Sequence, residues 1–458
     1  MFSTTDLRDL VTQVGALAVA ESDRERIDQL AALESLRNAA WAAQVRITVA
    51  FGESQVQQQR QQGVPEARAT RGVTEQVALA RRISPAVAAR EIETARALVE
   101  DLPATLRALQ AGDLGVAQAA AIARETALLA PADRAAIDIE LAASSEGQAT
   151  RQVEARARRR VREIDPDAAR RAAEAAEAAR RVIVRPRPDC TSELTAHLPA
   201  AAGTAIRQAL DEHARSLHAA GDSRTLDQLR ADTLIERLTG QQTADRVPVS
   251  VALVMTDRAL LAEDPTGEPE AHLDGYGPVP AWLARDLVTR LPETDTVALR
   301  RLFTDPTTGG VSGIDSRQRC FTGALRTAIR VRDQVCRTPY CGAPITQIDH
   351  VTPRAAGGPT SLANGQGLCQ RCNLAKQAAG WSTRPGDSAP GDGAEYSGPI
   401  GPGSTVRITT PTGHTYDSTP PPGPGRADPV TEPTREHPAD LGGPPRAGHG
   451  VDPPGRST

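Results

Sequence analysis

Apolar residues in the first part of the chain recur at the spacing of α-helices. Between residues 24 and 62 they return every three or four positions, which predicts one long amphipathic helix. Ser84 followed by Pro85 is typical of a helix start, because serine caps free backbone amides and proline fits the first turn. The further helices expected are 103–112, 114–129 and 131–143. Residues 1–181 are therefore expected to be a helical region.

Short runs rich in β-branched residues replace the helical spacing after residue 181. The predicted strands are 181–186 and 193–198, which flank a Pro-Asp-Cys turn as a hairpin, and then 247–255 and 299–303. The predicted helices in this part are 199–218 and 225–239. Residues 182–315 are therefore expected to be a mixed α/β continuation of the same domain.

The last third of the chain divides into three parts by composition. Residues 316–383 form a compact basic unit, in which nine Arg or Lys residues stand against two Asp. From residue 383 on, 16 of the 35 prolines fall within 76 residues, a density that prevents an ordered core. Within 384–418 we expect a loop and a small hairpin at 404–416 that docks back on the basic unit. We expect a disordered tail over 419–458.

Composition excludes several classes of protein. Aromatic residues make up only 2% of the 458 residues, too few for a β-sandwich or barrel. No run approaches the ~20 consecutive apolar residues of a membrane span, and the N-terminus lacks a basic segment followed by an apolar run. Six cysteines in a chain of this length do not indicate a secreted disulfide scaffold. We therefore expect a soluble, cytoplasmic protein without membrane contact.

Charge is unevenly distributed, although the net charge is only −4. Segment 151–187 carries twelve Arg against six acidic residues. A solvated helix face is the favoured interpretation of this segment, and a phosphate-facing surface is the alternative. Arginine accounts for all but one of the 53 basic residues, and the single lysine, Lys376, lies within the basic unit.

Four of the six cysteines form two short-spaced pairs, C-x4-C and C-x2-C. They are Cys336, Cys341, Cys369 and Cys372. Two such pairs separated by a loop are typical of tetrahedral zinc, because each tight turn presents two thiolates. Four thiolates leave no open position on zinc, so this metal is expected to be structural rather than catalytic. Two disulfides or free buried thiols are the alternative, which a cytoplasmic location disfavours.

Side chains suited to phosphodiester hydrolysis lie between and after these pairs. A neutral histidine such as His350 can take a proton from water near pH 7. The carboxylate of Asp349 and the amide oxygen of Asn373 suit Mg²⁺, which prefers oxygen ligands. Asp349 and His350 are adjacent, so on an extended strand they point to opposite faces, and they share one site only if the strand twists or bulges. Asn364 could simply cap a turn.

The run RVRDQVC…NLAK at 330–376 resembles the HNH endonucleases. The shared motifs are RD-x2-C, the two cysteine pairs, DH-x2-P, GG-x-T/S, N and N-x2-K. The resemblance implies a ββα-metal fold of two strands, a helix and a bound metal, with His350 as the general base. It implies that Asp349 and Asn373 bind a single catalytic Mg²⁺ or Mn²⁺, and that Asn364 holds the histidine-bearing strand. The family usually has His where this chain has Asn373, and variants with Asp, His and Asn in these roles occur.

Residues 5–315 resemble the long helical domain of unknown function numbered 222, which precedes HNH modules in many actinobacterial proteins. The segments that carry the resemblance are LRALQAGDLGV at 106–116, TLDQLRADTL at 225–234 and GYGPVPAWLA at 275–284. We transfer no site residues from this resemblance.

The favoured function is a metal-dependent endonuclease acting on DNA. Arg354, Arg371 and Lys376 are the expected phosphate contacts, which bind without reading sequence. Double-stranded DNA is favoured as the partner, because no aromatic cluster offers a stacking platform for single strands. Two alternatives stay open: a non-catalytic, zinc-stabilised nucleic-acid-binding protein, and an interaction protein whose helical half binds another chain.

Overall fold

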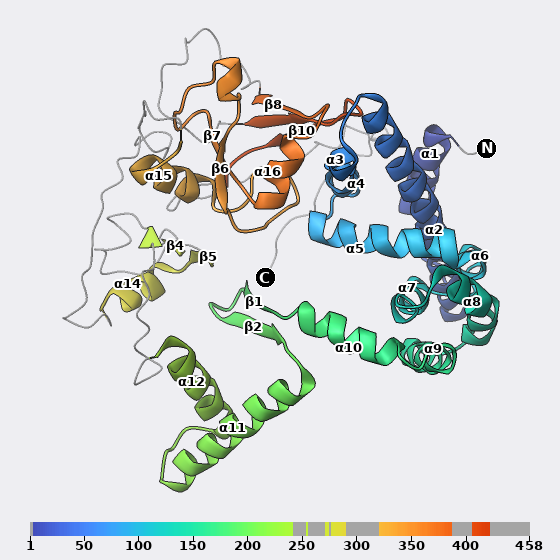
Figure 1. Cartoon of the computed structure of the whole chain (residues 1–458), viewed down its shortest axis with the longest axis horizontal. Helices are drawn as coiled ribbons and strands as arrows, with labels where there is room; N and C mark the ends of the chain where they lie inside the picture. Colours follow the sequence, from blue (N-terminus) through green and yellow to red (C-terminus); the bar gives the residue numbers. More distant parts are fainter. Residues whose placement is uncertain are drawn as a thin grey trace, which may run out of the picture.

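The computed structural model of the protein describes residues 3–240, 253–254, 271–273, 276–289, 320–386 and 405–421 (Figure 1). The N-terminal part of the chain is an array of helices. They are α1 (Thr4–Gly15), α2 (Asp23–Gln61), α3 (Glu66–Ala69), α4 (Val73–Arg81), α5 (Pro85–Arg96), the π-helical turn η1 (Ala97–Asp101), α6 (Pro103–Ala111), α7 (Val116–Glu125), α8 (Pro131–Ser145), α9 (Thr150–Ile164) and α10 (Ala168–Ala178).

Local sequence signals set the ends of these helices. α2 is the long helix that the apolar spacing predicts, and the side chain of Ser22 caps its first turn. Ser84 caps α5 in the same way, with Pro85 in the first helical position. The helix expected from Pro85 keeps α geometry as far as Arg96 and then widens into the π-helical turn.

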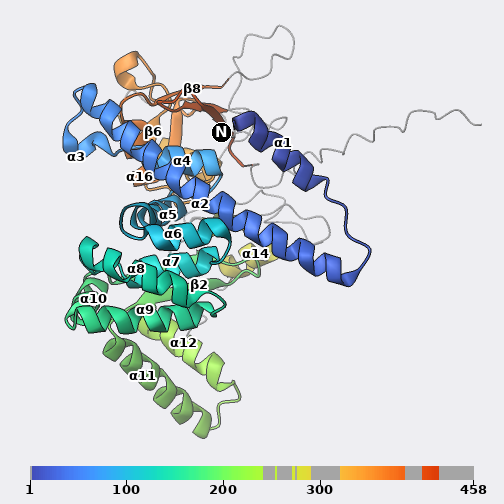
Figure 2. The ribbon, with the colours of Figure 1, turned by 90° about the vertical axis from the view of Figure 1, so that its right-hand side faces the viewer.

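A continuous apolar core joins the second half of α2 to the helices that follow. Its fully buried members include Leu98, Leu109, Ile122 and Leu141. α1 buries no residue, and together with the first half of α2 it extends away from this core (Figure 2). None of the helices in the described ranges combines the length and the apolar character needed to cross a membrane.

The middle of the chain contains a hairpin, two helices and a small sheet. Its elements are β1 (Arg181–Pro186), β2 (Ser192–His197), α11 (Ala200–Ala219), α12 (Leu226–Thr239), β3 (Leu253–Val254), β4 (Ala271–Leu273), β5 (Gly277–Val279) and α14 (Ala281–Thr289). β1 and β2 form the predicted hairpin, and β3, β4 and β5 form an antiparallel sheet. Only β3 of the predicted strand 247–255 is described, and the predicted strand 299–303 lies outside the described residues.

The C-terminal part contains two sheets and two helices, drawn in orange and red in Figure 1. Its elements are α15 (Gly323–Asp333), β6 (Gln347–His350), the 3-10 turn η2 (Arg354–Ala356), β7 (Gly365–Leu368), α16 (Gln370–Lys376), β8 (Ser382–Pro385), β9 (Val406–Thr409) and β10 (Thr415–Ser418). β6 pairs with β7, and the other sheet has the order β10-β9-β8. The predicted late hairpin is therefore present as β9 and β10. Residues 422–458, most of the predicted tail, lie outside the described residues.

The late hairpin docks on the segment that follows β6. Val406 and Ile408 of β9 pack against Val351 and the half-buried Trp381. A buried ionic cluster adds a second connection, in which Asp333 accepts from Arg332 at 2.6 Å and from Arg337 at 2.9 Å. Asp333 also accepts from the Gly367 amide of β7 at 2.7 Å, and Arg337 donates to the carbonyl of Ser418 at 2.6 Å. One carboxylate therefore ties α15, β7 and the end of β10 together.

The helical part and the C-terminal part touch where the end of α2 and the start of α4 meet the segment after α16 (Figure 2). Gln59 donates to the carbonyl of Ala379 at 3.3 Å. The indole of Trp381 lies over Gly72, where an added Cβ would stand 2.3 Å from its Nε1. Gly72 has φ +81°, a conformation that favours glycine, so both its backbone and its bare surface suit this contact.

Candidate active site and zinc centre

Two antiparallel strands and one helix form the frame that holds the predicted site residues. β6 pairs with β7 without a bulge, from Gln347 opposite Leu368 to His350 opposite Gly365. α16 follows β7 and packs against both strands. A Cβ on Gly365 would lie 2.3 Å from the side chain of Ile329 in α15, so the missing side chain lets this helix approach β7 closely. The predicted order of two strands followed by a helix is therefore confirmed.

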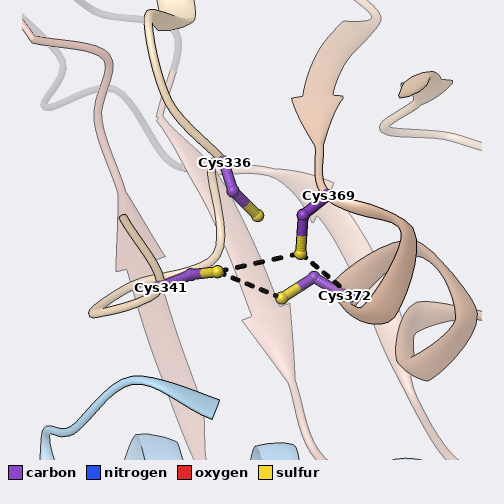
Figure 3. A group of neighbouring side chains, drawn as sticks. All are labelled: Cys336, Cys341, Cys369 and Cys372. Carbon is purple, nitrogen blue, oxygen red and sulfur yellow. Dashed lines mark hydrogen bonds between the residues drawn. The ribbon is translucent and has the colours of Figure 1, made fainter. Parts of the chain in front are cut away.

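The four predicted zinc ligands meet in one cluster (Figure 3). Cys336 and Cys341 come from the loop after α15, where Tyr340 and Gly342 both have positive φ and shape a tight turn. Cys369 caps the start of α16 and Cys372 lies in its first turn. All four sulfur atoms lie within 4.8 Å of one another. Two distant parts of the sequence are thus brought together as the spacing predicts.

The geometry of the cluster is compatible with structural zinc. Cys341 Sγ lies 3.8 Å from Cys369 Sγ and 3.6 Å from Cys372 Sγ. A tetrahedron with Zn–S bonds of about 2.3 Å places its sulfurs about 3.8 Å apart. Disulfides have no support here, because all four cysteines are free.

The face of β6 that looks toward α16 carries Gln347 and Asp349. Lys376 Nζ donates to Asp349 Oδ2 at 2.6 Å and also donates to the carbonyl of His350. Asn373 Nδ2 donates to Gln347 Oε1 at 2.5 Å. Gln347 and Asp349 are two residues apart and so share one face of the strand. Asn373 and Lys376 are three residues apart and so share one face of the helix, and these two faces meet. The structure thus pairs Lys376 with Asp349 and Asn373 with Gln347, both between β6 and α16.

An oxygen in this group lacks a partner. Asn373 Oδ1 is buried and accepts no hydrogen bond from any described residue. A buried amide oxygen without a partner costs free energy, so a native one calls for an explanation. Asp349, on the face of β6 that contacts α16, is partly exposed, with 27% of its side chain accessible. A partly exposed carboxylate on β6 and an unpaired amide oxygen on α16 are both ligands of the kind that hard divalent cations such as Mg²⁺ or Mn²⁺ prefer.

The side chain of His350 has different neighbours from that of Asp349, and β6 pairs with β7 without a bulge. Its ring contacts that of Phe321, with centroids 4.5 Å apart, and its Nε2 lies 3.0 Å from Thr360 Oγ1. Burial lowers the pKa of His350; Lys376 and Arg354 lower it further, while Asp349 opposes them. The imidazole is therefore neutral near pH 7 and able to accept a proton.

Asn364 closes the loop that follows the histidine. Its Oδ1 accepts from the Thr352 amide at 2.8 Å, and its Nδ2 donates to the carbonyls of Thr352 at 3.0 Å and Pro359 at 2.8 Å. Its side chain therefore uses both amide ends to hold the backbone two residues beyond His350. Gly358 completes the loop, since a Cβ there would lie 1.9 Å from the Thr352 carbonyl oxygen.

The three predicted phosphate contacts occupy different settings. Arg354 is exposed, and its Nη1 donates to Thr360 Oγ1 at 3.2 Å. Arg371 donates to Glu75 Oε1 at 2.8 Å, an ion pair that joins α16 to α4 of the helical part. Lys376 is largely buried against Asp349. Arg354 therefore lies beside the histidine, whereas each of the other two is paired with a carboxylate.

Sequence reasoning missed three partners of the predicted residues. Gln347 contacts Asn373, Thr360 contacts His350, and Glu75 contacts Arg371. Side chains alternate along a strand, so Gln347 lies on the same face of β6 as Asp349. This partner could therefore have been predicted from the sequence. Glu75 lies 296 residues from Arg371, and nothing in the sequence points to that pairing.

Comparison with known families agrees with this arrangement. Residues 336–379 match the HNH endonuclease family, over a segment that contains both cysteine pairs, β6, β7 and α16. The C-terminal module is thus an HNH endonuclease domain, which indicates a nuclease-type hydrolase with nucleic acid as its substrate.

Most of the remaining chain matches a second family. Residues 31–333 match the domain of unknown function DUF222, and this match extends through α15 to Asp333. The protein therefore belongs to the DUF222 family and carries an HNH domain at its C-terminal side. No curated protein and no solved structure matches the chain.

Proposed function

We propose that this protein is a metal-dependent endonuclease that hydrolyses phosphodiester bonds in double-stranded DNA. The observation that carries the proposal is the composition of one short strand, β6. Its last residue, His350, is a neutral base. Asp349 before it contacts Lys376 of α16, the helix on which the Oδ1 of Asn373 is unpaired. In the described residues β6 pairs only with β7. The proposal requires a phosphodiester to reach both residues at the end of this strand.

His350 serves as the general base. Its Nε2 is held by the hydroxyl of Thr360, which leaves Nδ1 as the ring nitrogen to receive a proton. A water molecule loses a proton to Nδ1, and its oxygen forms a bond to phosphorus. The bond between phosphorus and the 3′ oxygen breaks, which leaves a 5′ phosphate and a 3′ hydroxyl once that oxygen is protonated. Asn364 keeps the loop beyond the histidine in place.

Asp349 and Asn373 are the residues that would hold a single Mg²⁺ or Mn²⁺. Such an ion supplies positive charge to the scissile phosphate and to the departing oxygen. Arg354, Arg371 and Lys376 contact backbone phosphates, which gives affinity without sequence preference. Zinc on the four cysteines fixes the start of α16 and with it the position of Asn373, which directly follows Cys372.

The ion pair between Lys376 and Asp349 favours one competing function. An ammonium group already neutralises the carboxylate expected to bind the metal. A module arranged in this way could bind nucleic acid through its basic surface without cutting it. Both functions involve binding to nucleic acid, but a nuclease leaves cut strands whereas a binding module leaves them intact.

The test is incubation of the purified full chain with supercoiled plasmid, with Mg²⁺, with Mn²⁺ and with neither. Asp349→Ala and Asn373→Ala serve as site variants, each with its zinc content measured. The proposal predicts nicked or linear DNA from the wild type only when a divalent ion is added, and intact plasmid from both variants. Salt-sensitive binding with intact plasmid in every reaction would support the binding module and contradict the nuclease.

A further inference from the structure

Two side-chain contacts connect β6 with α16. One is the pair of Lys376 with Asp349, and the other is the hydrogen bond from Asn373 Nδ2 to Gln347 Oε1 at 2.5 Å. The second contact involves a residue to which neither sequence motif nor family match gives a role. Its position beside the unpaired Oδ1 of Asn373 makes it relevant to the metal.

An asparagine amide presents either its oxygen or its nitrogen to a given point, depending on how the group is rotated. Only the oxygen can bind a cation, because the NH₂ group is a donor without a lone pair available to a metal. In the structure Gln347 Oε1 accepts from the nitrogen of Asn373, and the oxygen of Asn373 is left without a partner.

We propose that Gln347 is a positioning residue, which orients the amide of Asn373 so that its oxygen faces the catalytic divalent ion. This inference rests on the proposed function, because it assumes that Asn373 binds that ion. Outer partners of this kind typically change metal affinity 10- to 100-fold when they are removed. Gln347 acts through an acceptor atom, so a residue that keeps an acceptor keeps the effect.

The experiment measures Mn²⁺ binding to the zinc-loaded full chain without DNA, by the loss of the free-Mn²⁺ signal in electron paramagnetic resonance. Gln347→Met keeps the length of the side chain and removes the acceptor. Gln347→Glu keeps the acceptor and cannot donate. Gln370→Met is the matched control, because Gln370 is exposed in the first turn of α16, the helix that carries Asn373. Zinc content and melting temperature confirm that each variant is folded, and Mn²⁺-dependent plasmid nicking is recorded in parallel.

The expected result is a 10- to 100-fold rise in the Mn²⁺ dissociation constant for Gln347→Met, with a matching rise in the Mn²⁺ needed for nicking. Gln347→Glu and Gln370→Met should bind Mn²⁺ at least as tightly as the wild type. Unchanged binding by Gln347→Met, or a loss of binding by Gln347→Glu, would overturn the role of Gln347 while leaving the nuclease intact. A wild type that neither binds Mn²⁺ nor nicks DNA would overturn both proposals together.

Discussion

The Nε2 atom of His350 lies 3.0 Å from the hydroxyl oxygen of Thr360, on the face of β6 opposite to Asp349. Thr360 is buried, and the same hydroxyl receives a hydrogen bond from Arg354. The contact occupies Nε2, and under the proposed function Nδ1 is the ring nitrogen that receives the proton from water. The proposed role of the histidine therefore makes Thr360, ten positions further along the chain, a positioning residue.

Replacing Thr360 by valine should slow plasmid nicking without unfolding the protein. Valine has nearly the same shape but lacks the hydroxyl, so the imidazole is free to rotate away from its working orientation. Misplacement of a catalytic group by about 1 Å can cost about 100-fold in rate. We expect a loss approaching that size in the single-turnover rate, with Thr360→Ser close to the wild type. Equal rates for the valine variant and the wild type would exclude a positioning role for the hydroxyl.

Asp333→Asn should strongly destabilise the C-terminal part. The side chain of Asp333 is fully buried and neutralises Arg332 and Arg337, so its loss leaves buried guanidinium groups without a counter-charge. Breaking a buried ion pair in this way costs about 3–5 kcal/mol. Asp417→Asn removes a carboxylate from a more exposed pair with Arg407, and should cost no more than about 1 kcal/mol. Urea unfolding with zinc present measures both, and similar losses for the two variants would argue against the buried cluster as a structural anchor.

Removal of one cysteine from the cluster should release zinc and loosen α16. Cys372→Ser replaces a buried thiolate by a hydroxyl, a poor zinc ligand. Structural zinc contributes about 10 kcal/mol or more of binding free energy in small domains, so we expect a large fall in melting temperature and sensitivity to chelators. Metal analysis should give one zinc per wild-type chain and none for the variant. Cys320→Ser is the control, because Cys320 is exposed and outside the cluster, and it should keep its zinc.

Glu75→Gln should strengthen DNA binding. The carboxylate of Glu75 is buried beside Arg371, and its charge opposes the approach of a phosphate to that guanidinium. Each additional phosphate contact steepens the slope of log K against log salt by about 0.9. We therefore expect tighter binding to a duplex. We also expect the slope of log K against log salt to steepen by about 0.9, the value for one added phosphate contact. Glu34→Gln, in an exposed pair with Arg37 on α2, should leave the slope unchanged. A slope for Glu75→Gln equal to that of the wild type would mean that the carboxylate of Glu75 does not hold Arg371 back from DNA.

Local features of the structure could be predicted from the sequence. Ser84 and Pro85 set the start of α5, and the apolar spacing of residues 24–62 gave the length of α2. The two cysteine pairs predicted their own cluster, because C-x4-C and C-x2-C turns present ligands within a few residues. The alternation of side chains along a strand accounts for the different neighbours of Asp349 and His350.

Contacts between distant segments could not be predicted in the same way. The pairing of Arg371 with Glu75 and the packing of Trp381 on Gly72 depend on how the helical part meets the nuclease module. A single sequence has no periodic or motif signal for such contacts, because either partner would look like an ordinary surface residue. Arg371 was predicted from its charge alone, and charge does not reveal that a carboxylate already lies beside it.

The single-turnover rate of plasmid nicking by His350→Ala tests the central claim most directly. The variant is compared with the wild type in saturating Mn²⁺, after equal zinc content and equal melting temperature have been established. Removal of a general base costs about 10²- to 10⁴-fold in rate, and the account predicts a loss in this range. Nicking by His350→Ala at the wild-type rate would contradict the account, because the proton would then be leaving water for some other group.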